Sequence, residues 1–130
     1  MASIFSKIIS GEIPCHKIAE NDKFLAFLDV FPLVHGHVLV VPKTEIDYIF
    51  DIDDEDLSEM MVFAKSIAKA QKAAIACKRI GVAVIGLEVP HAHIHLVPMN
   101  TVNDINFTQP KLKPNPEELS EMASKIKAKL

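Results

Sequence analysis

Residues 91–97 read His-Ala-His-Ile-His-Leu-Val, which puts a histidine at every second position and an apolar residue between each pair. Successive side chains of a β-strand point to opposite faces, so this period predicts that His91, His93 and His95 share one face. The apolar residues between them are then free to pack on the core. Three imidazoles in a row bring donors and acceptors that need partners when buried. The stretch therefore indicates a functional site.

Two chemistries suit such a row of histidines. Alternating histidines on a strand can share a zinc ion. A neutral imidazole can instead attack phosphorus, which requires one free ring nitrogen, an acceptor for the other N–H and donors for the phosphoryl oxygens. Mutual repulsion between neighbouring imidazoles lowers histidine pKa values and favours the neutral form near pH 7. The spacing alone leaves both chemistries open, beside a purely structural cluster.

The composition limits the class of protein. The chain has 130 residues and a net charge of −3, which suits one domain over residues 1–130. A mildly acidic balance argues against a nucleic-acid partner, and no apolar run reaches the roughly 20 residues of a membrane span. The N-terminus lacks the apolar core of a signal peptide, and Cys15 and Cys77 have no metal-motif spacing, so we expect a cytoplasmic protein. Arg79 is the one arginine, so a phosphate site needs other donors.

The pattern of apolar residues predicts an α+β fold with a mainly antiparallel sheet. We expect strands at 15–19, 24–29, 37–41, 79–87 and 91–97, with the last three central and the last two forming a hairpin. We expect helices at 4–10, capped by Ser3, at 53–76, capped by Asp53, and at 115–129, beginning with Asn115-Pro116. The stretch from 100 to 114 is polar and is expected to be irregular.

Three segments together resemble the histidine triad (HIT) family. Beside residues 91–97, residues 24–32 (Phe-Leu-Ala-Phe-Leu-Asp-Val-Phe-Pro) look like the family's ribose strand and its following loop. Residues 36–43 (Gly-His-Val-Leu-Val-Val-Pro-Lys) look like its G-H-x-L-V-x-P-K segment. The resemblance runs from Ile4 to Pro98. It implies a HIT-like fold: a five-stranded sheet, one long helix, a short N-terminal helix and a C-terminal helix at about 115–129 as an extension.

The resemblance also implies an activity. Similar proteins bind AMP-like purine nucleotides and cleave at the α-phosphate of nucleoside phosphoramidates or dinucleoside polyphosphates, through a nucleotidyl-histidine intermediate and without a cofactor. His93 matches the nucleophile, His95 the histidine that contacts the phosphate, and His91 and His37 the histidines that support the network. The alternative is a nucleotide-binding regulatory module with little turnover.

The resemblance extends to the nucleotide-binding residues. Asp29 matches the carboxylate that accepts hydrogen bonds from the ribose hydroxyls. The loop before the triad carries Gly86, Glu88 and Val89, whose backbone N–H groups are candidates for binding phosphate. Glu88 stands where some relatives have a neutral hydroxyl donor, so it either turns away from the phosphate or is protonated and acts on the leaving group. The residues that match the apolar walls around the base, or else ordinary core, are Ile4, Phe5, Ile8, Phe27, Leu28 and Val30.

The sequence departs from the family pattern at two further places. Zinc-carrying relatives have a Cys-x-x-Cys pair where this chain has Ser3 and Ser6, and Glu45 stands near a ligand histidine's position, so we expect no metal. Met99 stands where some dinucleoside polyphosphate hydrolases have arginine, which argues against a long polyphosphate substrate.

The resemblance also implies a homodimer whose sheets join across the interface. The predicted 53–76 helix carries a stripe of methionine and alanine that allows close packing, either between subunits or on its own sheet. The stripe comprises Met60, Met61, Ala64 and Ala68.

Overall fold

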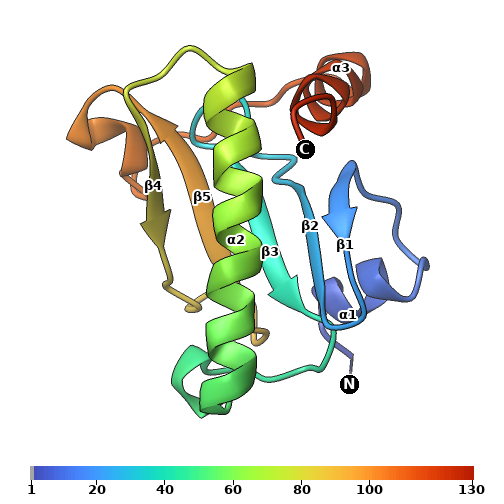
Figure 1. Ribbon diagram of the computed structural model, residues 1–130. Coiled ribbons are helices and arrows are strands. Elements are labelled where there is room, and N and C mark those ends of the chain that lie inside the picture. Colours follow the sequence, from blue (N-terminus) through green and yellow to red (C-terminus); the bar gives the residue numbers. More distant parts are fainter. Residues whose placement is uncertain (1) are drawn as a thin grey trace.

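The computed structural model describes residues 2–130; Met1, part of the predicted 1–130 domain, lies outside the described residues. The strands are β1 (Lys17–Glu20), β2 (Phe24–Leu28), β3 (Val38–Pro42), β4 (Arg79–Ala83) and β5 (Ile94–Met99). The helices are α1 (Ile4–Ile9), α2 (Asp54–Ala74) and α3 (Pro116–Lys127), with 3-10 turns η1 (Ile49–Asp51) and η2 (Val102–Ile105). The strands form one antiparallel sheet in the order β1-β2-β3-β5-β4 (Figure 1). The predicted α+β class is confirmed.

Each of the three helices begins at the predicted cap. The side chain of Ser3 accepts a hydrogen bond from Ser6 N–H, and that of Asp53 accepts one from Asp56 N–H. Asn115 forms a capping box with Glu118, and Pro116 follows it at the first helical position. These side chains satisfy backbone N–H groups that have no partner within a helix.

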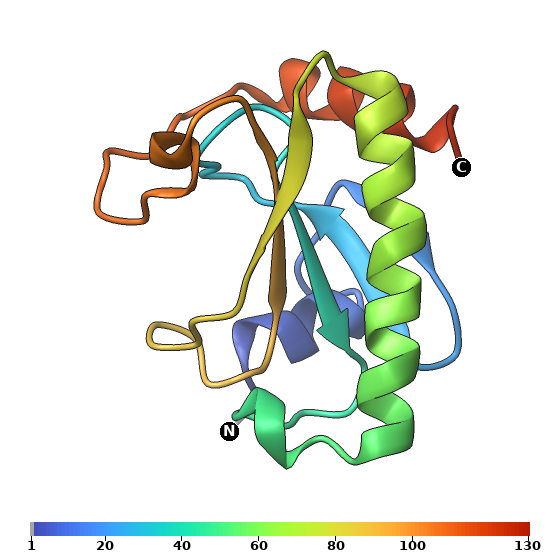
Figure 2. The ribbon, with the colours of Figure 1, turned by 60° about the vertical axis from the view of Figure 1, so that its left-hand side comes forward.

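The central strands β2, β3 and β5 are buried on both faces of the sheet, with α2 on one face and α1 on the other (Figure 2). On β2 and β3, the even-numbered side chains pack beneath α2 and the odd-numbered ones face α1, as the alternation of a strand requires. The core beneath α2 includes Phe24, Ala26, Leu28, Val38, Val40, Ile94, Leu96, Met60, Ala64 and Ile67. The smaller core on the α1 face comprises Phe5, Leu25, Phe27, Leu39 and Val41.

The stripe predicted on α2 is confirmed only in part. Met61 lies on the exposed side of α2 and not on its buried stripe, which Met60 and Ala64 form. The apolar side of α3 joins the core beneath α2 through Leu119, Ala123 and Ile126.

Within residues 2–130, no helix is both long and apolar enough to cross a membrane.

β4 differs from its prediction as a central strand. It ends at Ala83 instead of residue 87, and it is an edge strand, because only β5 pairs with it. Its apolar residues and those of the loop that follows are largely exposed, namely Val82, Val84, Ile85 and Leu87. A continuous apolar run predicted burial, yet the elements within residues 2–130 leave 41% or more of each of these residues exposed. The antiparallel β4–β5 hairpin itself is confirmed.

β5 begins at Ile94 instead of residue 91. Residues 91–93 bend before the strand, because Ala92 N–H donates to Ile46 O instead of to a neighbouring strand. β3 ends at Pro42, which is its last residue, whereas β5 continues through Pro98 to Met99 instead of ending at residue 97.

Candidate active site

The predicted histidines meet on the face of the sheet opposite α2. The rings of His93 and His95 have centroids 4.8 Å apart, and His37 lies 5.1 Å from His95. Phe5, from α1, contacts the rings of His91 and His93 at 5.7 Å and 4.9 Å. All four histidines are buried, with at most 8% of any of them exposed. Because odd-numbered side chains share one face of the sheet and β3 pairs with β5, the rings of His37, His93 and His95 come together there.

The bond between His37 and His95 can run in only one direction when both rings are neutral. Leu33 N–H donates to His37 Nδ1 at 3.1 Å, so His37 carries its proton on Nε2. His37 Nε2 lies 2.9 Å from His95 Nδ1 and donates to it. His95 therefore carries its own proton on Nε2, where it is available as a donor.

His93 has the opposite arrangement. Its Nδ1–H donates to the backbone oxygen of His91 at 2.8 Å, which leaves a lone pair on Nε2. Neither His93 Nε2 nor His95 Nε2 bonds to another group within residues 2–130, and neither is among that region's fully buried unpaired atoms. Neighbouring rings therefore offer a free lone pair on His93 and a free N–H on His95, which is what attack on phosphorus with stabilisation of its oxygens requires.

His91 uses both of its ring nitrogens for hydrogen bonds. Nε2–H donates to Pro42 O at 2.8 Å, and Nδ1 accepts from the Ser3 hydroxyl at 2.7 Å. Neither ring nitrogen of His91 is therefore free, and this geometry does not suit a metal bound jointly by His91, His93 and His95. Ligand atoms of Asp29, His37 and His95 do lie within 4.8 Å of one another, but the two imidazoles are already bonded to each other.

Burial keeps the imidazoles of His37, His93 and His95 neutral near pH 7. Desolvation, aided by His95, Lys111 and His93, lowers the pKa of His37 to about 3. Desolvation, aided by His93 and Lys111, lowers the pKa of His95 to about 4. The pKa of His93 is also lowered, chiefly by burial. Neutral rings are the forms that the hydrogen bonds above require.

Asp29 follows β2 beside these rings. Its Oδ1 accepts from Phe31 N–H at 2.9 Å, and its Oδ2 lies 3.8 Å from His37 Nε2, beyond hydrogen-bond distance. Burial raises the pKa of this carboxyl, against the opposing effects of the Phe31 N–H and the Lys111 charge. Oδ2 is therefore an acceptor that is partly withdrawn from water and ready for a hydroxyl donor.

The residues predicted to form the walls around the base do not all lie on the histidine face of the sheet. Phe5 and Phe27 make an edge contact at 5.8 Å on the histidine face, and Ile8 and Val89 pack against the same small core. The prediction that Leu28 contacts the base is wrong, and the residue is ordinary core. As an even-numbered residue of β2 it lies in the core beneath α2. Half or nearly half of the surface of Ile4 and of Val30 is exposed, so both are accessible to a ligand.

The loop before the triad lies next to the site. Gly86 has a φ of +71°, which favours glycine at this turn. Glu88 is exposed, and its negative charge adds to the effect of burial in raising the pKa of Asp29, while it opposes the effect of burial that lowers the pKa of His93. The side chain thus acts on the histidine site rather than on a remote surface.

Two residues at the site were missed by the sequence reasoning. Phe107 packs its ring against His95 at 4.6 Å and against His37 at 6.3 Å. Lys111 Nζ donates to Phe107 O at 2.7 Å and lies 5.8 Å from the centre of its ring. Both come from the stretch that was predicted to be irregular, and an aromatic residue within that polar stretch was the one available signal.

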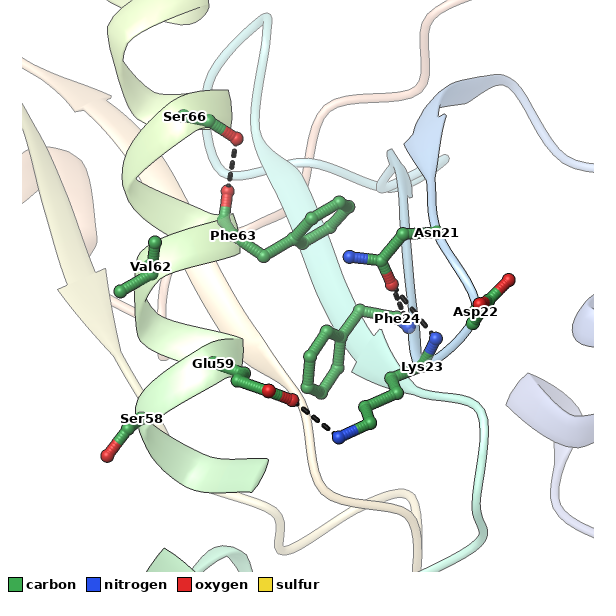
Figure 3. Close-up of a pocket in the computed structure, with 9 residues that line it drawn as sticks. All are labelled: Asn21, Asp22, Lys23, Phe24, Ser58, Glu59, Val62, Phe63 and Ser66. Carbon is green, nitrogen blue, oxygen red and sulfur yellow. Dashed lines mark hydrogen bonds and ion pairs between the residues drawn. The ribbon is translucent and has the colours of Figure 1, made fainter. Parts of the chain in front are cut away.

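A surface hollow on another part of the molecule offers less chemistry. It lies between α2 and the turn before β2 and includes Phe24, Phe63 and Lys23 (Figure 3). The Lys23 ammonium pairs with Asp56 at 2.9 Å and with Glu59 at 2.6 Å. None of the histidines lines it, and its Lys23 ammonium is already paired, so we place the candidate site at the histidines.

The chain is similar to known proteins along most of its length. Residues 10–102 match the family model of the HIT domain. The chain is 32% identical over 136 aligned positions to an adenosine 5'-monophosphoramidase from Schizosaccharomyces pombe, covering 100% of this chain and 99% of that protein. A Hit-like protein involved in cell-cycle regulation from Bartonella henselae has a similar structure, with a TM-score of 0.85, 34% identity, and coverage of 98% and 96%. A zinc-bound histidine triad family protein from Mycobacterium smegmatis is also similar in structure, with a TM-score of 0.83 and 27% identity. The match covers 99% of this chain and 93% of that one.

Proposed function

The chain belongs to the HIT family, and we propose that it is a nucleotide-binding hydrolase that cleaves AMP-like conjugates at the α-phosphate. One observation carries the proposal: the unprotonated Nε2 of His93 stands on the ring next to His95, whose Nε2 bears a proton. A relative named as an adenosine 5'-monophosphoramidase, aligned along its whole length, supports the same class of reaction.

The proposed reaction has two steps. His93 Nε2 forms a bond to the α-phosphorus while the bond from phosphorus to the leaving amine breaks, and that amine takes one proton from solvent. Water then forms a bond to phosphorus, the bond to His93 breaks, and the water returns one proton. His95 Nε2–H donates to a phosphoryl oxygen in both steps. The products are AMP and the free amine, and His93 is regenerated without a cofactor.

The residues around the histidines suit the rest of an AMP-like ligand. The free Oδ2 of Asp29 is the proposed acceptor for a ribose hydroxyl. The apolar side chains on the same face are proposed to contact the base, and the loop N–H groups near Gly86 and Glu88 are proposed to bind phosphate. The proposed base contacts are Phe5, Phe27, Ile8, Ile4 and Val30, and Val89 belongs to the loop that is proposed to bind phosphate.

The charges near the site favour a phosphoramidate over a long polyphosphate. Glu88 places a negative charge near His93, and a carboxylate repels further phosphates but tolerates an amine. Residue 99 is methionine, so it adds no cation there. Turnover of adenosine phosphoramidate and of a dinucleoside polyphosphate tests the proposal, and we expect faster release of AMP from the first. Nucleotide binding with negligible turnover of both would favour the regulatory module instead.

We further propose that two copies join through β4. This strand has a free edge, and exposed apolar side chains lie on and just after it, including Val82 and Ile85. We propose a purine nucleotide as the ligand, with no nucleic-acid or membrane partner. A cytoplasmic location is proposed, and Cys15 and Cys77 are both free thiols.

A further inference from the structure

Glu45 joins the start of α1 to the loop after β3. One of its carboxylate oxygens, Oε1, accepts from Ser3 N–H at 2.6 Å and from the Ser6 hydroxyl at 2.7 Å. These two donors lower the pKa of Glu45 to about 2. The residues are far apart in sequence, so this carboxylate fixes where the first turn of α1 lies on the molecule.

Ser3 connects this anchor to the histidines. Its hydroxyl oxygen accepts from Ser6 N–H at 3.0 Å, and its O–H donates to His91 Nδ1 at 2.7 Å. The direction of the second bond follows from His91 Nε2–H, which donates to Pro42 O. Ser3 is only 7% exposed, so water has little access to replace this donor.

His91 is in turn hydrogen-bonded to the ring of His93. Its backbone oxygen accepts from His93 Nδ1–H at 2.8 Å, and this bond leaves the lone pair on His93 Nε2. Both ring nitrogens of His91 are hydrogen-bonded, so the residue has little freedom to move. Its backbone oxygen is therefore held in place as well. An unbroken series of hydrogen bonds therefore runs from Glu45 to the proposed nucleophile.

The side chains of Ser3, Ser6, Glu45 and His91 do not together fit a zinc ion. Zinc in proteins takes thiolate, imidazole or carboxylate ligands, whereas two of these side chains are serine hydroxyls that are already hydrogen-bonded. A similar protein from Mycobacterium smegmatis is zinc-bound. In this chain, hydrogen bonds of Ser3, Ser6 and Glu45 hold the N-terminal helix against His91.

We propose that Ser3, anchored by Glu45, is a positioning residue that holds His91 and thereby sets the tautomer and orientation of His93. This inference rests on the proposed hydrolase function. It assigns a role in turnover to two residues that touch neither the nucleotide nor the reacting phosphorus.

The first test compares variants of Ser3 by kcat and KM for adenosine phosphoramidate. Ser3→Ala removes the donor to His91, and we expect kcat to fall about tenfold with little change in KM. Ser3→Thr retains the hydroxyl and should restore most of kcat. Ser3→Asp retains the helix cap but offers only acceptors, so it should resemble Ser3→Ala. Asn115→Ala is the matched control, because it removes the cap of α3 and should leave kcat unchanged.

Glu45 offers a second route that leaves the Ser3 hydroxyl in place. Its side chain lies at the surface, so Glu45→Ala should fold, and we expect kcat to fall several-fold. Glu45→Gln retains an oxygen acceptor and should remain close to the unmodified protein. Circular dichroism melting of every variant separates loss of fold from loss of positioning.

A spectroscopic readout distinguishes this inference from the proposed function. In a ¹⁵N-labelled sample, long-range proton–nitrogen NMR spectra report which nitrogen of His91 and His93 carries the proton. We expect Nε2–H on His91 and Nδ1–H on His93, with both signals broadened or shifted in Ser3→Ala. Unchanged spectra and an unchanged kcat in a folded Ser3→Ala variant would overturn the positioning role. Absence of turnover in the unmodified protein would instead count against the hydrolase proposal.

Discussion

His37 Nε2 lies 2.9 Å from His95 Nδ1, and Leu33 N–H at His37 Nδ1 fixes the direction in which this bond donates. The protonated nitrogen of His95 is consequently Nε2. His93, bonded through Nδ1–H to His91 O, keeps its lone pair on Nε2. The fold thus sets a free N–H on His95 and a free lone pair on His93, on neighbouring rings.

Removal of the His37 donor tests this arrangement. His37→Phe keeps a planar ring of similar size but leaves His95 Nδ1 without its partner, so His95 loses its fixed tautomer. We expect kcat/KM for adenosine phosphoramidate to fall by about 10- to 100-fold, because His95 then offers its N–H less often. His35→Phe is the control: this histidine lies in the same loop but is exposed. Equal activities of the two variants would contradict the role of His37.

The lowered histidine pKa values predict a pH-dependent stability. Below the ordinary pKa of 6.5, the unfolded chain binds protons at these positions, while folded His37 and His95 resist protonation down to about 3 and about 4. The free energy of unfolding therefore falls as the pH drops from about 6.5 to about 4.5, by up to about 1.4 kcal/mol per pH unit for each such histidine. Burial raises the pKa of Asp29, which opposes this trend toward the acidic end.

Urea unfolding at a series of pH values measures this slope. His95→Asn removes one of the two groups, so its slope should be shallower than that of the unmodified protein. A free energy of unfolding that stays constant from pH 6.5 to 4.5 would show that these rings accept protons readily in the folded state.

Much of the fold could be predicted because its signals are local. The caps Ser3, Asp53 and Asn115 mark where helices begin, since each side chain bonds an N–H of the next turn. The alternation in residues 91–97 predicted which side chains share a face. The same alternation applied to β2 would have placed Leu28 beneath α2.

The errors concern relationships between distant parts of the chain. An apolar run such as the β4 segment has the same pattern whether a strand, a second subunit or solvent lies beside it, so its edge position could not be predicted. Phe107 reaches His95 because its segment crosses the histidine face after β5, and no local period encodes that crossing.

Asp29 provides a test of how the nucleotide is held. Asp29→Asn removes the charge of the proposed ribose acceptor, and a hydrogen bond to a charged group contributes about 1.5–3 kcal/mol, so AMP should bind at least about tenfold more weakly. The variant should also lose the preference of the protein for AMP over 2'-deoxy-AMP. Isothermal titration measures both ligands, with Asp22→Asn in an exposed turn as the control. An unchanged preference in Asp29→Asn would remove this carboxylate from the ribose site.

The β4 edge predicts the oligomeric state. Sedimentation velocity should show a dimer, and Val82→Lys combined with Ile85→Lys should shift it toward the monomer, because charges on an exposed strand edge oppose pairing. Val102→Lys, on the exposed η2 turn, should leave the dimer intact. A monomer in the unmodified protein at micromolar concentration would argue against the proposed interface.

The central claim is that His93 Nε2 attacks the α-phosphorus. The most direct measurement is the rate of AMP release from adenosine phosphoramidate by His93→Ala, made together with the affinity of that variant for AMP. We expect turnover to fall at least about a thousandfold while the AMP affinity and the melting temperature change little, since the other contacts to the nucleotide remain. Turnover by His93→Ala at the rate of the unmodified protein would contradict the account.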